Sequence, residues 1–333
     1  MNKKKEDIKN NNDISIFSEK FNNYRFIEKW EKLPTSTNIE LFSTNAFNSI
    51  NSKRNSRVLD LCCGTGKGTI YLAFNWNVGE ITYVDQSKTA LEMAREVISN
   101  HHRSSLISTQ FICQPAELLD KYDLGSFDSI IIRYAIHLLN KPHILLSNLY
   151  RILNPGGRIV FNFAGSNIYN FSNPNFNAVP NFLGQCHPFF GAVYMACKEI
   201  EDDIILAVPS SDYNHLVSIG ALQKMDSGDY KFGTRNLIKY NIAIVRKMIF
   251  KAGIPQSNIS YDLTWLRASF GDKASYAYTF GAPPIPGIWS LFNTMSKDIK
   301  IELTQKIMNI AQKRLSPKFN FYFPEPIFTI TRD

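Results

Sequence analysis

Two acidic residues lie on either side of a glycine-rich turn in the first third of the chain. Residues 57–66 read R-V-L-D-L-C-C-G-T-G, so an apolar strand that carries Asp60 runs into a turn with Gly64 and Gly66. A helical stretch and a second apolar strand follow, and this second strand ends in Asp85. Glycines let the backbone turn tightly and approach a ligand, and an acid at the end of the second strand can accept both hydroxyls of a ribose. The pattern therefore predicts a nucleotide-binding site.

The acid before the turn indicates which kind of nucleotide would bind. Dinucleotide sites use the spacing G-x-G-x-x-G, whereas the glycines here stand at positions 64, 66 and 68. Asp60 would repel a pyrophosphate, but it suits a ligand that carries a positive amino group or a sulfonium. We therefore favour a cationic nucleoside. A generic glycine turn in another α/β domain is the alternative.

Strands and helices alternate around this turn. Apolar runs predict strands near 57–61, 80–84, 109–113, 128–132 and 157–163, with helices near 67–75, 87–100 and 142–153. Ser87 is the expected N-cap of the second helix. Further along, we expect a helix at 236–252 that stops at Gly253, a strand at 259–266, a helix at 296–314 and a final strand at 327–331. Alternation of this kind indicates a parallel sheet with helices on both faces.

The chain changes character after Phe163. Asn, Pro, Gly and aromatic residues are frequent from 164 to 235, which predicts an ordered insertion with irregular backbone. We expect five parts: a disordered tail at 1–13, a helical lid at 14–50, a cofactor-binding core at 51–164, a cap insertion at 165–235, and a C-terminal part of the core at 236–333 with an additional cap segment at 268–315.

These motifs together resemble class I S-adenosylmethionine-dependent methyltransferases. The D-x-x-x-G-x-G pattern is similar to their motif I, and S-F-D, A-x-H and L-x-P-G-G-R follow in the order found in the family of ubiquinone- and menaquinone-biosynthesis enzymes and natural-product methylases. The likeness covers about residues 55–165. It implies an α/β fold with a doubly wound, seven-stranded, mostly parallel Rossmann-like sheet and an antiparallel last strand. It also implies S-adenosyl-L-methionine as cofactor and S-adenosyl-L-homocysteine as product.

The resemblance assigns a set of cofactor-binding residues. They are Asp60, Gly64, Gly66, Asp85, Gln86, Ala116, Glu117 and Arg133. Gln86 stands where the family usually has an apolar side chain stacked on adenine, and Pro115 replaces an Asp that usually binds the adenine amino group. Adenine is therefore expected to bond near Ala116 and Glu117, although Glu117 could equally be a solvated acid at a helix start.

The catalytic and substrate residues follow less directly. His137 falls on the A-x-H element and is either a general base or a histidine packed at a strand–helix junction. His187 and His215 are alternatives for the base. The expected substrate residues are Tyr24, Tyr134, His187 and Tyr276. An aromatic-rich cap favours a mid-sized hydrophobic or aromatic small molecule as substrate.

Composition limits the other classes of partner. The 333 residues carry a net charge of +8, but part of the excess lies in Lys3, Lys4 and Lys5, and no alternating aromatic–basic array suggests a nucleic-acid platform. No apolar run is long enough for a membrane span. The five cysteines lack C-x-x-C spacing, so neither a disulfide framework nor a metal site is expected, and a cytoplasmic location fits.

Two other functions stay open at this point. The basic balance allows an RNA methyltransferase, including one that acts on a cap. The departures at Gln86 and Pro115 allow a catalytically inactive partner subunit with the cofactor fold. The sequence leaves the oligomeric state open between a monomer and a homodimer.

Overall fold

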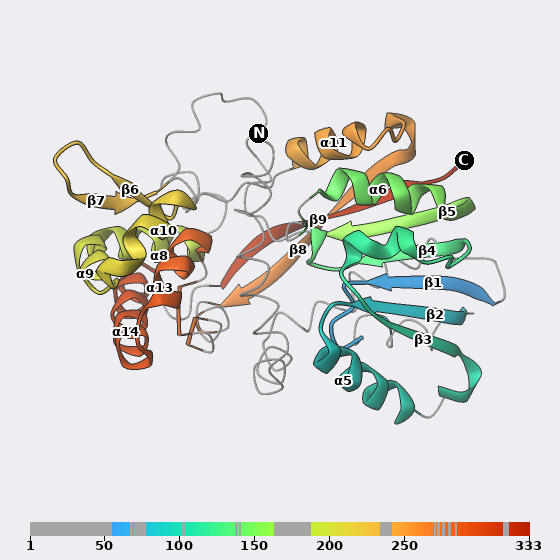
Figure 1. Ribbon diagram of the computed structural model, residues 1–333, viewed down its shortest axis with the longest axis horizontal. Helices are drawn as coiled ribbons and strands as arrows, with labels where there is room; N and C mark the ends of the chain where they lie inside the picture. The colour runs from blue at the N-terminus through green and yellow to red at the C-terminus, as the bar shows by residue number, and fades with distance from the viewer. Residues whose placement is uncertain are drawn as a thin grey trace. The chain divides into compact units, whose positions relative to one another are not determined.

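Strands from three separate parts of the sequence form one sheet in the computed structural model (Figure 1). They are β1 (Ser56–Leu61), β2 (Val78–Asp85), β3 (Ser108–Cys113), β4 (Phe127–Ile132), β5 (Leu153–Asn162), β8 (Ile259–Ser269) and β9 (Asn320–Thr331). The structure describes residues 55–66, 69, 78–101, 104–136, 139, 141–162, 188–233, 242–269, 271, 274, 277–278, 281–283, 285–315 and 320–333.

The order and direction of these strands confirm the predicted fold class. The described part of the sheet has seven strands in the order β3-β2-β1-β4-β5-β9-β8. β1 runs parallel to β2 and β4, and the pairs β2–β3 and β4–β5 are also parallel. β9 is antiparallel to β5, with Ile330 opposite Ile159. The reversal of order on the two sides of β1 is the topological switch point at which open α/β sheets bind ligands.

The helices that accompany the sheet begin and end close to their predicted positions. They are α5 (Lys88–Ser99), α6 (Pro142–Arg151) and α11 (Ile242–Lys251), with short 3-10 helices at Ser104–Leu106, Ala116–Lys121 and Gln256–Asn258. Ser87 caps α5 by accepting a hydrogen bond from the Ala90 N–H, and the left-handed Gly253 (φ +79°) follows α11. Most of the helix predicted at 67–75 lies outside the described residues.

Helix α5 packs against one face of the sheet. Leu91 and Ile98 of this helix pack on a cluster that contains Val58, Tyr83 and Ile131 from three neighbouring strands. Because side chains alternate along a strand, Asp60 of β1 points to the same face as Val58.

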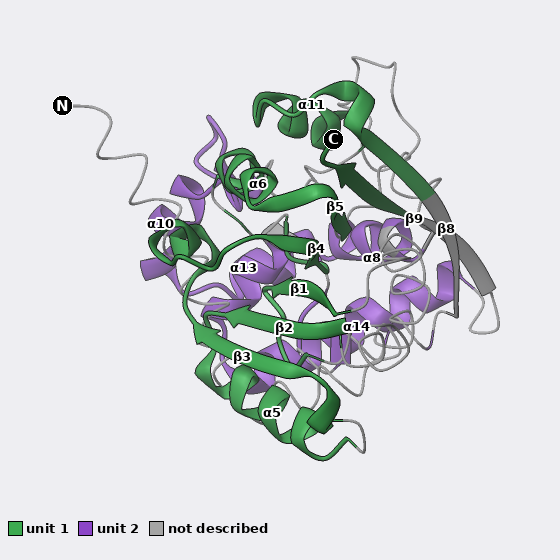
Figure 2. Ribbon diagram, turned by 90° about the vertical axis from the view of Figure 1, so that its right-hand side faces the viewer, with its two compact units in different colours: residues 1–164, 242–264, 325–333 green, residues 165–241, 265–324 purple. Residues whose placement is uncertain are grey.

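Two compact units divide the chain (Figure 2). Unit 1 comprises residues 1–164, 242–264 and 325–333, and unit 2 comprises residues 165–241 and 265–324. The described elements of unit 2 are α8 (Pro188–Glu199), α9 (Glu201–Leu206), a 3-10 turn at Ser210–Asp212, α10 (Tyr213–Ser218), the antiparallel hairpin β6 (Leu222–Lys224) and β7 (Tyr230–Phe232), α13 (Pro286–Thr294) and α14 (Lys297–Arg314).

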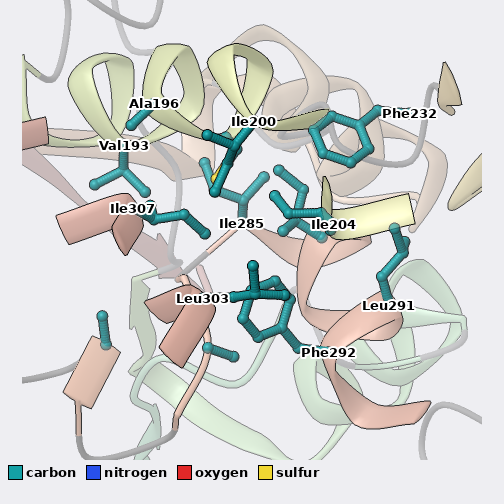
Figure 3. Close-up of a cluster of buried hydrophobic side chains, with 14 of the residues drawn as sticks. Val193, Ala196, Ile200, Ile204, Phe232, Ile285, Leu291, Phe292, Leu303 and Ile307 are labelled. Carbon is teal, nitrogen blue, oxygen red and sulfur yellow. The ribbon is translucent and has the colours of Figure 1, made fainter. Parts of the chain in front are cut away.

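The prediction of irregular backbone for the insertion was wrong over residues 188–233. This stretch is mostly helical and ends in a hairpin. The helices surround a hydrophobic core of their own, in which side chains from α8, α9, α13 and α14 gather (Figure 3). The labelled members include Val193, Ile204, Phe292, Leu303 and Ile307. An apolar helix such as α8 lacks the polar stripe that marks an amphipathic helix in sequence, because it is buried on more than one side.

Candidate functional site

The glycine turn after β1 has a backbone that other residues adopt with difficulty. Gly64 and Gly66 have φ values of +56° and +69°. A Cβ atom on Gly66 would lie 3.2 Å from Cε1 of Tyr83 and 3.3 Å from Cβ of Ala94, so the turn passes tightly over β2 and α5. A Cβ atom on Gly64 would meet no atom within 4 Å. The turn is therefore packed on one side and has free space beside Gly64, where a ligand could approach the backbone.

Asp85 connects this turn to the start of α5. Its Oδ2 accepts the Gly64 N–H at 2.9 Å, and its Oδ1 accepts the Ser87 N–H at 2.8 Å. Burial raises the pKa of Asp85, while the N–H groups of Ser87 and Gly64 act in the opposite direction. Each carboxylate oxygen has a second lone pair, so Asp85 can hold the turn and still accept hydrogen bonds from a ligand.

Asp60 is the most deeply buried acid of the site, with a residual exposure of 4%. It accepts a hydrogen bond from the Thr69 hydroxyl, which is also buried. Burial raises the pKa of Asp60 to about 6, and the Thr69 hydrogen bond and the charge of Arg133 oppose the shift. The sequence-based set did not contain Thr69, because nothing in the spacing shows that its hydroxyl turns back to Asp60.

The segment after β4 is held by a second residue that sequence reasoning missed. Tyr134 has a left-handed backbone (φ +51°), and its N–H donates to Oδ1 of Asn162 at 2.7 Å. Asn162 is fully buried in β5. A single polar side chain in the apolar run I-V-F-N-F was the available signal. This bond fixes the backbone next to Arg133 at the carboxyl edge of the sheet.

The ends of β2 and β3 bring the predicted adenine-side residues to the same edge. Asp85 pairs with Cys113 in the parallel ladder, and the Gln114 N–H donates to the Asp85 carbonyl at 3.0 Å. Ala116 is buried and Glu117 is partly buried at the start of the following 3-10 turn, whereas the Gln86 side chain is exposed.

Comparison with known proteins agrees with this geometry. Residues 59–161 match a family described as "Methyltransferase domain". This range begins within β1 and ends within β5, so it contains both acids and the glycine turn.

Over residues 59–161 the chain thus resembles a methyltransferase domain.

Two curated relatives that match this region carry the same name. The demethylmenaquinone methyltransferase of Lactococcus lactis is 34% identical over 106 residues, which are 31% of this chain and 40% of the relative. The enzyme of the same name from Staphylococcus epidermidis is 27% identical over 178 residues, which are 52% of this chain and 69% of the relative. The matched part of this chain thus spans less than half of the Lactococcus relative.

A solved structure of phosphoethanolamine N-methyltransferase 2 from Haemonchus contortus, in complex with S-adenosyl-L-methionine, is also similar to this chain. The match has 14% sequence identity and a TM-score of 0.47, and it covers 93% of this chain and 57% of that chain.

Several predicted residues lie outside the described part of the chain. Tyr24, His137, His187 and Tyr276 belong to this group. His215, an alternative for the base, is exposed on α10 of unit 2. Of the predicted substrate residues, Tyr134 alone is described, beside the methyltransferase domain's Arg133.

The described residues place further limits on the site. They contain no group of three side chains that could hold a metal ion. Cys62, Cys63, Cys113 and Cys197 are free thiols. Among the described helices, none has the length and apolarity needed to traverse a bilayer.

Proposed function

We propose that this chain is an S-adenosyl-L-methionine-dependent methyltransferase that transfers a methyl group to an O, N or C atom of a mid-sized hydrophobic or aromatic small molecule. The observation that carries the proposal is the 2.9 Å hydrogen bond from the Gly64 N–H to Asp85, which joins the acid after β2 to the turn after β1. This bond holds the Asp85 carboxylate beside the free space at Gly64.

The chemistry of these groups fits the cofactor. S-adenosyl-L-methionine supplies a methyl group that its sulfonium has already activated. Asp85 would accept the ribose hydroxyls through the lone pairs that Gly64 and Ser87 leave unused. Asp60 would place negative charge toward the ammonium group. The backbone at Gly64 and Gly66 would approach the methionine part and the ribose.

The remaining cofactor positions are part of the same proposal. Gln86, Ala116 and Glu117 would surround adenine, and Arg133 would contribute backbone near the methionine end. The Asp85–Cys113 pairing and the Gln114 bond support this arrangement, because they hold the ends of β2 and β3 together.

The residues proposed for the methyl acceptor are inferred from the resemblance to the methyltransferase family. We assign His137 as the candidate base, and Tyr24, Tyr134, His187 and Tyr276 as candidate substrate residues. The relatives are named for demethylmenaquinone, which supports a small organic acceptor over a protein or a nucleic acid. A cytoplasmic location, with the chain as a monomer or a homodimer, completes the proposal.

The cofactor assignment is tested by the substitution Asp85→Ala. We expect S-adenosyl-L-methionine to bind more weakly by about 1–3 kcal/mol, because the ribose hydroxyls lose their partner. Isothermal titration calorimetry gives the affinity directly. Asp85→Asn serves as a second variant that keeps an acceptor for the turn, and the exposed Asp229→Ala is the matched control.

Two outcomes of this titration would contradict the proposal. Unchanged affinity in Asp85→Ala would remove the ribose role of Asp85. No binding by the unmodified chain would favour the inactive partner subunit.

The acceptor class needs a separate assay. A cofactor labelled on its methyl group is incubated with the protein and either a small-metabolite extract or total RNA. We expect label in an organic-soluble product. Label in the RNA fraction, with salt-dependent retention of RNA, would support the RNA methyltransferase instead.

A further inference from the structure

The deepest acid of the site has a single described hydrogen-bond donor. Asp60 is 4% exposed and Thr69 is 1% exposed, and the Thr69 hydroxyl donates to Oδ2 of Asp60. The Thr69 N–H donates to the Gly66 carbonyl at 3.1 Å. Thr69 is therefore bonded both to the acid of β1 and to the glycine turn.

The charged and titratable groups around Asp60 come from every neighbouring strand. Asp85 from β2 disfavours its ionised form, and Arg133 after β4 favours it. Burial raises the pKa of Cys62, Cys63 and Tyr83, and the negative charge of Asp60 raises it further. No described cation forms an ion pair with Asp60. The Thr69 hydroxyl is thus the main local group that stabilises the carboxylate.

We propose that Thr69 is a positioning residue of the cofactor site, which holds Asp60 in its ionised form beneath the glycine turn and so makes the binding of a cationic nucleoside depend on the protonation of Asp60. This inference rests on the proposed function, because it takes S-adenosyl-L-methionine as the ligand.

The direction of the pH effect follows from charge. A cationic ligand binds the ionised carboxylate better than the neutral acid. Affinity should therefore fall as the pH drops through the pKa of Asp60, which is about 6. Below that pKa the affinity changes by at most about tenfold per pH unit, since one proton is involved.

The Thr69 hydroxyl should set where this change occurs. A hydrogen bond to the charged form of an acid lowers its pKa, so removal of the bond raises it. Thr69→Val has nearly the same shape without the donor, and Thr69→Ser keeps the donor. Backbone contact between Thr69 and Gly66 remains in both variants.

A second buried threonine provides a matched control. Thr82 in β2 is fully buried, and its Oγ1 has no hydrogen-bond partner among the described residues. Thr82→Val thus makes the same chemical change at another buried position, in β2, without removing a bond to Asp60.

The experiment is a calorimetric titration of the full chain with S-adenosyl-L-methionine between pH 5 and pH 8. For the unmodified protein we expect the affinity to rise by about tenfold over this range. In Thr69→Val the midpoint of the rise should move upward by about one pH unit. Thr69→Ser and Thr82→Val should follow the unmodified protein, and Asp60→Asn should bind weakly with a flat profile.

The outcomes separate this inference from the proposed function. If the unmodified protein binds the cofactor with a flat pH profile, or if Thr69→Val keeps the original midpoint, the role of Thr69 is overturned and the methyltransferase proposal stands. If the unmodified protein binds no cofactor at any pH, the proposed function itself fails. Should Thr69→Val not fold, Thr69→Ala, which also lacks the donor, makes the same test of the midpoint.

Discussion

The two units bury an acidic side chain in opposite ways. Among the described residues, Asp60 of unit 1 and Glu201 of unit 2 are the buried acids. Glu201 accepts the Phe232 N–H at 2.6 Å and forms an ion pair with Lys198 three residues earlier. Asp60 has the Thr69 hydroxyl, and no described cation is bonded to it.

This difference separates a structural carboxylate from one available for a ligand. A buried charge without a counterion is unfavourable, and proteins retain such groups chiefly where function needs them. In unit 2 the cation is built into the protein, and Glu201 joins α9 to the hairpin. In unit 1 the cation would arrive with the cofactor. The comparison therefore predicts that the cofactor binds to unit 1, while the buried acid of unit 2 has a structural role.

Core substitutions test this division with the largest effects. Phe127 in β4 and Phe292 in α13 are both fully buried, and replacement of either by Ala should lower the free energy of unfolding by about 3–5 kcal/mol. We expect Phe127→Ala to lower the midpoint of the urea transition that S-adenosyl-L-methionine shifts to higher urea concentration. Phe292→Ala should lower the midpoint of a transition that the cofactor does not shift.

Both variants are measured by urea unfolding with and without cofactor. If Phe292→Ala abolished cofactor binding in the absence of urea, the assignment of the site to unit 1 alone would be wrong.

The pH dependence of stability compares the two buried acids. The pKa of Asp60 is about 6 in the folded chain, and its ordinary value, which we take for the unfolded chain, is 3.8. At a pH between these two values, the folded state therefore holds a proton that the unfolded state has lost. Stability must then fall as the pH rises, by about 2 kcal/mol between pH 4 and pH 6. Asp60→Asn should remove this loss.

The measurement is the difference in unfolding free energy between the variant and the unmodified chain at each pH. Glu201→Gln is the matched carboxyl-to-amide change in unit 2 and should not remove the loss. An identical slope in Asp60→Asn and in the unmodified protein would contradict the unusual protonation of Asp60.

The sheet could be predicted because its signals are local. Buried parallel strands appear as continuous apolar runs, and the residues around 130 and 160 have this form. Helix α5 carries its own start signal in Ser87, and α11 its stop signal in Gly253. The antiparallel direction of β9 has no such local signal, and it came from family resemblance alone.

In unit 2 the helix predicted at 296–314 is confirmed by α14, but the helices between residues 188 and 218 could not be predicted in the same way. An Asn- and Pro-rich segment precedes residue 188, and it led to the prediction of irregular backbone for the helices that follow. The apolar side chains of α8 pack in one hydrophobic core with those of α14, which lies more than 90 residues later in the chain. Such tertiary packing overrides local propensity, and a single sequence does not display it.

The sequence suggests candidate site residues only where the residue type itself points to a role. Asp60 and Asp85 could be selected as candidates because acids at strand ends beside glycines have few structural uses. Thr69 and Asn162 were missed because their contacts with the site are hydrogen bonds that the sequence does not show, to Asp60 and from the Tyr134 N–H respectively. Hydroxyl and amide side chains are common in loops and strands, so only the fold reveals these partners.

Helix caps give the smallest and most local test of the comparison between units. Ser87 is fully buried and accepts the Ala90 N–H at 3.1 Å, whereas Ser296 caps α14 from an exposed position at 3.5 Å. Ser87→Ala should lower the free energy of unfolding by about 1 kcal/mol, and Ser296→Ala by about half as much or less. The exposed Ser99→Ala at the other end of α5 is the control. Because the Ser87 N–H that donates to Asp85 survives in Ser87→Ala, cofactor affinity measured by calorimetry should not change. A clear loss of affinity in this variant would mean that the cap, and not only the backbone at Ser87, holds Asp85 in place, which would extend the site into α5.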